Sequence, residues 1–311
     1  MNLVTTTTSL PALDALVASQ PRFQVDGTGP VSQRTITPAT PAATRLLESA
    51  PAARDALRGV LRLVEHAAGG AAASSNVEFN GVSLATSPEG LSANTYRAHR
   101  DDDPIFQAAI ARLPAADRPA AVAGMAASKV RESAGMLANV AAGWMNVGPA
   151  ASTALLAAVG AAPPGVRVPQ QQLADAVHVL LHESTHVIDT EPANLPPLAM
   201  HGVWEALAEA RSTKLPQLQA ARRVLGLDAV VSDAGLQASA RHRPYAQAER
   251  ILDGVLRTAG IEPGSAAAER VTSSTGHDAV ETLVAKMAAT TGESPNTARQ
   301  AIGAAFAEAM G

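Results

Sequence analysis

The chain of 311 residues contains no cysteine. Disulfide bonds and thiolate zinc sites are therefore excluded, and any metal ion must be bound by histidine, aspartate or glutamate side chains. Aromatic residues are also scarce, at 3% of the chain, whereas alanine is abundant. This composition favours closely packed helices over a β-sandwich.

The chain also lacks a surplus of basic residues and a long apolar run. The formal net charge is −4, so we expect no nucleic-acid partner, because phosphates would not be neutralised. The longest apolar stretch, about 150–162, ends at Pro163-Pro164 and is too short to cross a bilayer, so we expect no membrane association. No standard secretory signal is visible. A cytoplasmic location is the default expectation, and non-standard secretion stays open.

About half of the residues are apolar (47%), enough to form a sizeable core. We expect a flexible Thr/Ser/Pro-rich tail over 1–40, apart from a short helix near 11–19. A helical N-terminal lobe with a small β-sheet is expected over 41–165. A helical C-terminal lobe is expected over 166–311, after a Pro/Gly-rich joint. The predicted fold class is α+β and mostly helical.

Two segments of the N-terminal lobe have strand patterns. Residues 77–84 contain Asn80-Gly81 between alternating runs, which predicts a β-hairpin. A second strand is expected over 93–99. One exposed strand edge of this sheet could bind an extended peptide by strand addition.

The clearest chemical motif is His-Glu-Ser-Thr-His at 182–186. Residues four apart lie on one face of a helix, so His182 and His186 can bind a single metal ion. Glu183 lies about 100° further round the helix and can reach a water on that ion. Two metal ligands and a general base thus come from five residues.

The helix around this motif is amphipathic. Asp175, His178, His182, His186 and Asp189 form a polar stripe at helical spacing, and apolar residues lie on the opposite side. A catalytic zinc ion usually has three protein ligands and one open position. On the next predicted helix, Glu205 and Glu209 are the candidates for the third ligand.

His-Glu-x-x-His, 18 further residues and then Glu205 resembles the gluzincin metallopeptidases, which include thermolysin-like enzymes and many zinc aminopeptidases. The resemblance covers about residues 170–255 and implies a zincin-like two-lobed fold and a Zn²⁺ cofactor. It also implies Glu205 as the third ligand, Glu209 as the partner of a ligand histidine, and Tyr245 as a hydrogen-bond donor to the transition state.

The chain departs from two related patterns. It lacks the Gly-x-Met-Glu-Asn motif of the aminopeptidases, which argues against an aminopeptidase. It also lacks the metzincin extension, because Asp189 stands in place of the glycine and Pro192 in place of the third histidine.

Several residues near the motif have alternative interpretations. Glu209 is a rival for the ligand position of Glu205. His178 could line a cleft between the two expected lobes or pair with Asp175, and Asp189 could orient a histidine or end the helix. His242 and His277 are alternatives to Tyr245, which could equally be an ordinary residue at a helix start.

The sequence therefore predicts a zinc metalloendopeptidase acting on a peptide or protein substrate, with Glu183 as general base. Such an enzyme could act in the cell or be delivered as a toxin or effector. Two other hypotheses stay open. One is a catalytically silent metal-binding protein with a regulatory or partner-binding role, and the other is a structural helical protein with a fortuitous motif. Oligomeric state and cleavage specificity are not determined.

Overall fold

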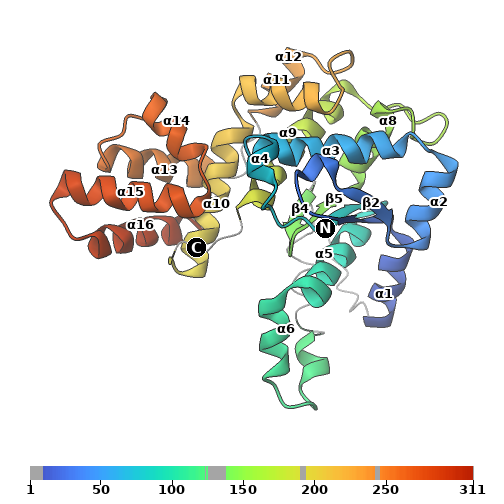
Figure 1. The fold of residues 1–311 in the computed structure, drawn as a ribbon, viewed down its shortest axis with the longest axis horizontal. Coiled ribbons are helices and arrows are strands. Elements are labelled where there is room, and N and C mark those ends of the chain that lie inside the picture. Colours follow the sequence, from blue (N-terminus) through green and yellow to red (C-terminus); the bar gives the residue numbers. More distant parts are fainter. Residues whose placement is uncertain (1–9, 123, 125–137, 190–193, 242–245, 311) are drawn as a thin grey trace, which may run out of the picture.

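The computed structural model describes residues 10–122, 124, 138–189, 194–241 and 246–310. The fold is α+β and mostly helical, with one small five-stranded sheet (Figure 1). This confirms the fold class that the sequence predicts. The strands are β1 (Arg22–Asp26), β2 (Thr35–Pro38), β3 (Gly81–Leu84), β4 (Ala138–Ala141) and β5 (Trp144–Val147).

The helices fall into two groups along the chain. Those up to the metal motif are α1 (Leu10–Ser19), α2 (Pro41–Ser49), α3 (Ala53–Ala67), α4 (Ala71–Ser74), α5 (Pro88–Asp102), α6 (Pro104–Ala111), α8 (Pro149–Ala158) and α9 (Gln170–Ile188). Those after it are α10 (Pro197–Ser212), α11 (Leu215–Val224), α12 (Asp233–Ser239), α13 (Ala246–Thr258), α14 (Ala266–Thr272), α15 (Gly276–Thr291) and α16 (Pro295–Met310). None of these described helices is both long and apolar enough to cross a membrane.

The sheet has the strand order β2-β1-β3-β5-β4. The β3–β5 pair is parallel and the other pairs are antiparallel. Phe23, Val82 and Met145 are aligned across neighbouring strands and are fully or almost fully buried. They belong to the larger of two main hydrophobic cores, which also contains the apolar sides of α3 and α9. The other face of the sheet contacts α5.

The smaller core is made by α10 and the helices that follow α12. It contains Val203 and Leu207 of α10 together with buried residues of α13, α14, α15 and α16. The larger core contains residues from both sides of the lobe boundary expected at 165, and it extends to Leu236 of α12. Helix α10 packs against α9 on one side and against α13 and α16 on another, so it connects the two cores. In Figure 1 the helices of the smaller core form a separate body beside the sheet.

The expected flexible tail over 1–40 is wrong for residues 10–40, and residues 1–9 lie outside the described residues. The short helix predicted near 11–19 is confirmed as α1. Strand β1 then lies between β2 and β3 in the sheet, and Phe23 is fully buried. The polar composition of this segment suggested disorder, but β1 presents only alternate residues to the core. A five-residue strand therefore needs few apolar side chains to pack against that core.

The hairpin expected at Asn80-Gly81 is also wrong. Gly81 begins β3, which pairs with β1 and β5, while the β4–β5 hairpin turns at Ala142-Gly143. Both turn residues have positive φ, 46° and 75°, as a type I′ turn requires. Asn80 supports this turn from outside, because its Nδ2 donates to the carbonyl of Ala142 at 2.9 Å and its backbone N–H to that of Gly143 at 2.8 Å.

The strand expected over 93–99 is instead the middle of α5. Ser87 accepts a hydrogen bond from the Gly90 N–H, and Pro88 occupies the first turn. This serine-proline pair is an ordinary helix start, and it outweighs the strand propensity of Thr95 and Tyr96. The Thr95 hydroxyl lies within hydrogen-bond distance of two acceptors, Leu91 O within the helix at 2.9 Å and Asn139 Oδ1 of β4 at 3.0 Å.

A matched pair of glycine substitutions should test this packing. A Cβ at Gly81 would lie 2.3 Å from Phe23 O and 2.4 Å from a Trp144 ring carbon, whereas one at Gly254 in α13 would meet nothing within 4 Å. We expect Gly81→Ala to destabilise the fold by at least about 1–3 kcal/mol through overpacking. Gly254→Ala should stabilise it by about 0.5–1 kcal/mol, because alanine favours a helix interior. Urea denaturation followed by circular dichroism measures both, and equal effects would contradict the close approach at Gly81.

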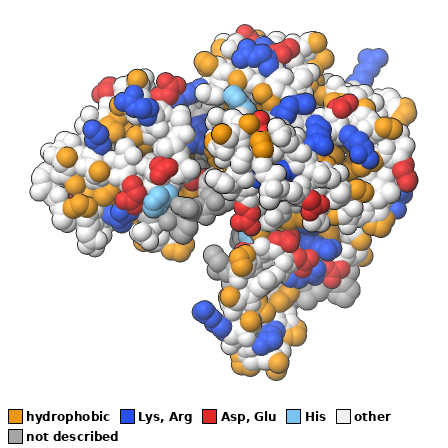
Figure 2. Space-filling model, in the orientation of Figure 1, with side chains coloured by type: hydrophobic (Ala, Val, Ile, Leu, Met, Phe, Trp, Pro, Cys, Tyr) orange, Lys and Arg blue, Asp and Glu red, His pale blue; other side chains and the backbone are white. Residues whose placement is uncertain are grey.

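The visible surface carries both signs of charge. Figure 2 shows basic and acidic side chains interspersed over the face that it presents. This mixed pattern agrees with the small net charge of −4.

Candidate metal centre

Helix α9 carries the two histidines of the motif. Its apolar residues, among them Leu173, Val177 and Leu180, are buried in the larger core, which fixes the rotation of the helix about its axis. Ser184 and Thr185 are buried as well, and each hydroxyl donates to the carbonyl four residues earlier. The fixed rotation directs the remaining side of α9, with both histidines, towards α10.

Helix α10 supplies the acidic residues. It begins at Pro197, and the small residues Gly202, Ala206 and Ala208 let neighbouring helices approach closely. Glu205 and Glu209 lie one turn apart and are 5% and 0% exposed. The contact between α9 and α10 therefore buries both carboxylates, and charged side chains are rarely buried in this way unless they are paired.

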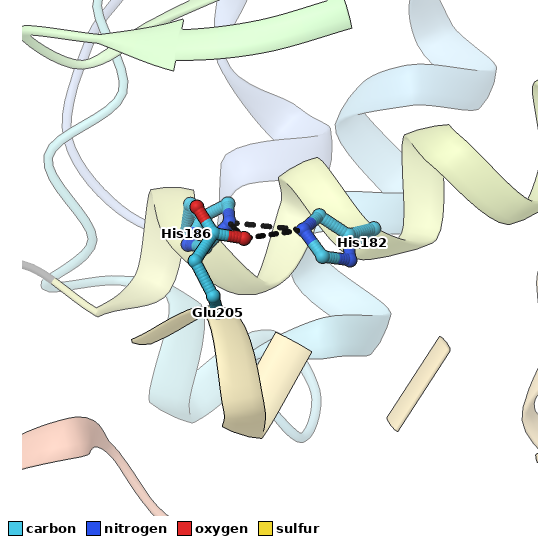
Figure 3. A group of neighbouring side chains, drawn as sticks. All are labelled: His182, His186 and Glu205. Atoms are coloured by element: carbon cyan, nitrogen blue, oxygen red, sulfur yellow. Dashed lines mark hydrogen bonds and ion pairs between the residues drawn. The ribbon is translucent and has the colours of Figure 1, made fainter. Parts of the chain in front are cut away.

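Three donor atoms converge at this contact (Figure 3). His182 Nε2 lies 3.1 Å from Glu205 Oε2 and 3.1 Å from His186 Nε2. The third edge, from His186 Nε2 to Glu205 Oε2, is 3.5 Å. The two imidazole rings are nearly perpendicular, at 73°. The structure thus brings together the three residues that the sequence predicts as ligands, in a group that could hold a metal ion.

The size and chemistry of this triangle fit a metal ion. Zinc bound to nitrogen and oxygen at about 2.0–2.2 Å in tetrahedral geometry needs ligand atoms about 3.3–3.6 Å apart. The edges of 3.1, 3.1 and 3.5 Å are close to that size. A neutral imidazole carries a proton on only one nitrogen, so two facing Nε2 atoms and a carboxylate oxygen offer lone pairs to a cation.

The outer nitrogen of His182 faces acceptors on α10. Nδ1 lies 3.7 Å from Glu209 Oε2 and 3.5 Å from Ser212 Oγ. With Nδ1 protonated towards these groups, Nε2 presents its lone pair to the site. Glu209 therefore lies beside the outer nitrogen of His182, the histidine whose partner the family resemblance implies it to be. Ser212 was not predicted, although it lies three residues after Glu209 on the same helix face.

The charges of the three groups depend on one another. Burial raises the pKa of Glu205, but hydrogen bonds from His182 and His186 outweigh it, and the pKa falls well below its usual range. Burial lowers the pKa of His186, but the hydrogen bond with Glu205 and the charges of the nearby carboxylates together outweigh it, and the net shift is upward. Glu205 therefore stays ionised and attracts positive charge, either a proton on a histidine or a metal ion.

Glu183 follows His182 on α9 and is 7% exposed. Burial raises the pKa of its carboxyl, and the nearby His186 and His182 oppose that shift. A carboxyl whose pKa is raised above its ordinary value binds a proton more readily at neutral pH. Glu183 is thus suited to exchange protons beside the three converging atoms.

Two other residues of the predicted polar stripe have partners away from the triangle. His178 Nδ1 lies 3.2 Å from Ser239 Oγ of α12, so His178 connects α9 to α12. Asp189 ends α9, and its buried carboxylate accepts a hydrogen bond from the Gly276 N–H at the start of α15. Helices α10 and α12 pack against α9 and cover much of this stripe.

His201 is a further residue that the sequence interpretation missed. Its Nε2 lies 3.7 Å from Glu205 Oε1, and its side chain is 50% exposed. It precedes Glu205 by one helical turn, so helical periodicity alone could have identified it. By contrast, Tyr245 and His242, two predicted candidates for the hydrogen-bond donor, lie outside the described residues, as does Pro192.

Removing the carboxylate behind His182 should weaken metal binding. We expect Glu209→Ala to reduce metal affinity by about 10–100-fold, because the Nδ1 partner fixes the tautomer and ring orientation of the ligand. Competition with a chromophoric chelator measures this affinity. Glu308→Ala, at an exposed position of α16, is the matched control and should leave it unchanged. Equal metal affinities in Glu209→Ala and Glu308→Ala would show that Glu209 does not support metal binding.

Comparison of the chain with protein-family models, with curated proteins and with solved structures gave no match.

Proposed function

We propose that this chain is a zinc-dependent metalloendopeptidase of the gluzincin type. The observation that carries the proposal is the convergence of His182, His186 and Glu205 beside the buried carboxyl of Glu183. Two imidazoles and one carboxylate are the donor set of several catalytic zinc sites, which keep a fourth position open. The motif spacing in the sequence independently points to the same group of enzymes.

Zinc held at this site would supply Lewis acidity, lowering the pKa of water to about 7 and polarising a substrate carbonyl. Glu183 accepts the proton of the attacking water and then donates it to the leaving amine. His182 and His186 are neutral ligands and Glu205 carries a single negative charge, so the assembled centre keeps a net positive charge. Glu209 and Ser212 keep His182 oriented by facing its Nδ1.

The fold supports the assignment to a zincin-like two-lobed architecture. Helix α9 belongs to the core that also covers one face of the sheet, and α10, which carries Glu205, contributes its apolar residues to the second core. The side chain of His186 is 15% exposed and that of His201 50%, so solvent reaches the group from the α10 side.

A cleavage assay tests this function. Purified chain loaded with zinc should cut an unfolded protein such as reduced and alkylated casein at internal bonds. Cleavage should stop with 1,10-phenanthroline, continue with its non-chelating 1,7 isomer, and return when zinc is restored. The proposal is wrong if well-folded, zinc-loaded protein cuts no unfolded substrate, or if the chelator has no effect.

The burial of the site favours one alternative, a metal-binding protein without turnover. The side chains of His182 and Glu205 are only 8% and 7% exposed, which restricts approach by a polypeptide. The same assay separates the two functions. Stoichiometric zinc without cleavage would favour the binding protein, and zinc-dependent cleavage would favour the peptidase.

A further inference from the structure

The two carboxylate oxygens of Glu205 contact different histidines. Oε2 lies 3.1 Å from His182 Nε2 and 3.5 Å from His186 Nε2, so it belongs to the converging group (Figure 3). Oε1 lies 3.7 Å from Nε2 of His201, which is also on α10. The carboxylate therefore has one oxygen among the candidate ligands and the other beside a third histidine.

The contact with His201 follows from the geometry of the helix. His201 precedes Glu205 by four residues, so the two side chains lie on one face of α10. The Cα–Cβ bonds of a helix tilt towards its N-terminus, and the side chain of Glu205 therefore leans towards the turn that carries His201. Helix α10 thus supplies both the third donor and a partner for its outer oxygen.

The two side chains differ in exposure. That of Glu205 is 7% exposed and that of His201 is 50% exposed. A buried carboxylate oxygen has given up hydrogen bonds to water, so a nearby donor stabilises it. An imidazole with its proton on Nε2 is such a donor even when the ring is neutral. At 3.7 Å, a small rotation of the exposed ring or one bridging water completes the hydrogen bond.

A partner for Oε1 affects how Glu205 can bind a metal ion. A carboxylate binds metal ions through one oxygen or through both. Binding through both would occupy a further coordination position, and a catalytic zinc site keeps one position open for water. His182 already has an outer partner of this kind, since Glu209 Oε2 lies 3.7 Å from its Nδ1. His201 stands in the corresponding position to Glu205.

We propose that His201 is a positioning residue that holds Oε1 of Glu205, so that Oε2 alone is presented to the metal ion. The inference deepens the proposed function and rests on its metal centre. Loss of the N–H donor at position 201 then has two effects. Metal affinity falls, and the coordination number rises because both oxygens of Glu205 bind.

Cobalt substitution tests this role, because protein-bound Co²⁺ absorbs visible light more strongly with four ligands than with five. The wild type should give the stronger spectrum. His201→Leu, which removes the donor, should give the weaker one and bind zinc about 10-fold less tightly, the lower end of the range for outer partners. His201→Gln places an amide N–H near the position of Nε2 and should keep both properties. Leu198→Ala, at an exposed position of the same helix end, is the control and should also keep both.

Two results would overturn the positioning role. One is that His201→Leu keeps the wild-type cobalt spectrum and zinc affinity. The other is that His201→Gln changes them as much as His201→Leu does. Since the His201 side chain is half-exposed, neither substitution should disturb the fold, and circular dichroism of the metal-free proteins checks this.

These measurements use no substrate, so they separate the inference from the peptidase function. If the wild type cuts no peptide but His201→Leu changes the spectrum and the affinity, the peptidase function fails and the role of His201 stands. If the wild type cuts peptides and His201→Leu changes neither quantity, the role of His201 fails and the peptidase function stands.

Discussion

His186→Ala should reduce bound zinc from about one ion per chain, the content of a single catalytic site, to background. The substitution removes one of three converging donors and leaves only His182 Nε2 and Glu205 Oε2, 3.1 Å apart. Losing a direct ligand should weaken affinity by more than the roughly 10–100-fold that outer partners contribute. Elemental analysis of purified, dialysed protein measures the content.

Thermal unfolding gives an independent measure of the same loss. A ligand that binds only the folded state at 100 times its dissociation constant stabilises that state by about 2.7 kcal/mol. Added zinc should therefore raise the unfolding temperature of the wild type and not that of His186→Ala. His66→Ala, at the end of α3, is the control and should keep both zinc and the shift. Full zinc content in folded His186→Ala would show that the metal is not bound at the contact between α9 and α10.

Glu183→Gln should retain zinc and lose peptide cleavage by about 10²–10⁴-fold in kcat, the usual contribution of a general base. Glutamine has nearly the same shape as glutamate but cannot accept the proton of the attacking water. Glu183 supplies none of the three converging atoms, so the metal content should not change. Steady-state kinetics on a defined peptide, together with elemental analysis, gives both quantities.

The two substitutions separate binding from chemistry. His186→Ala should lose metal and activity together, whereas Glu183→Gln should lose activity alone. A Glu183→Gln protein with near wild-type turnover would mean that another group moves the proton. A Glu183→Gln protein that also lacks zinc would mean that Glu183 holds the metal or supports the fold.

The sequence alone was sufficient for the parts of this site that depend on helical periodicity. Spacing of four residues places His182 and His186 on one face of any α-helix, whatever surrounds it. The short helix expected near 11–19 was also found, as α1. Glu205 was predicted as a ligand from its spacing and from resemblance, and the structure places it in the converging group.

Only the tertiary structure decided what lies around that helix. Ser212, His201 and Ser239 contact side chains of the site or of α9 from other turns and helices. The true hairpin depends on Asn80, 62 residues away from Ala142, whose carbonyl it bonds. Contacts between distant segments follow from how α9, α10 and α12 pack, and hydrophobic packing is nearly non-directional, so a local pattern does not specify its partners. Local periodicity thus determined which residues can share a face, and packing determined what each face meets.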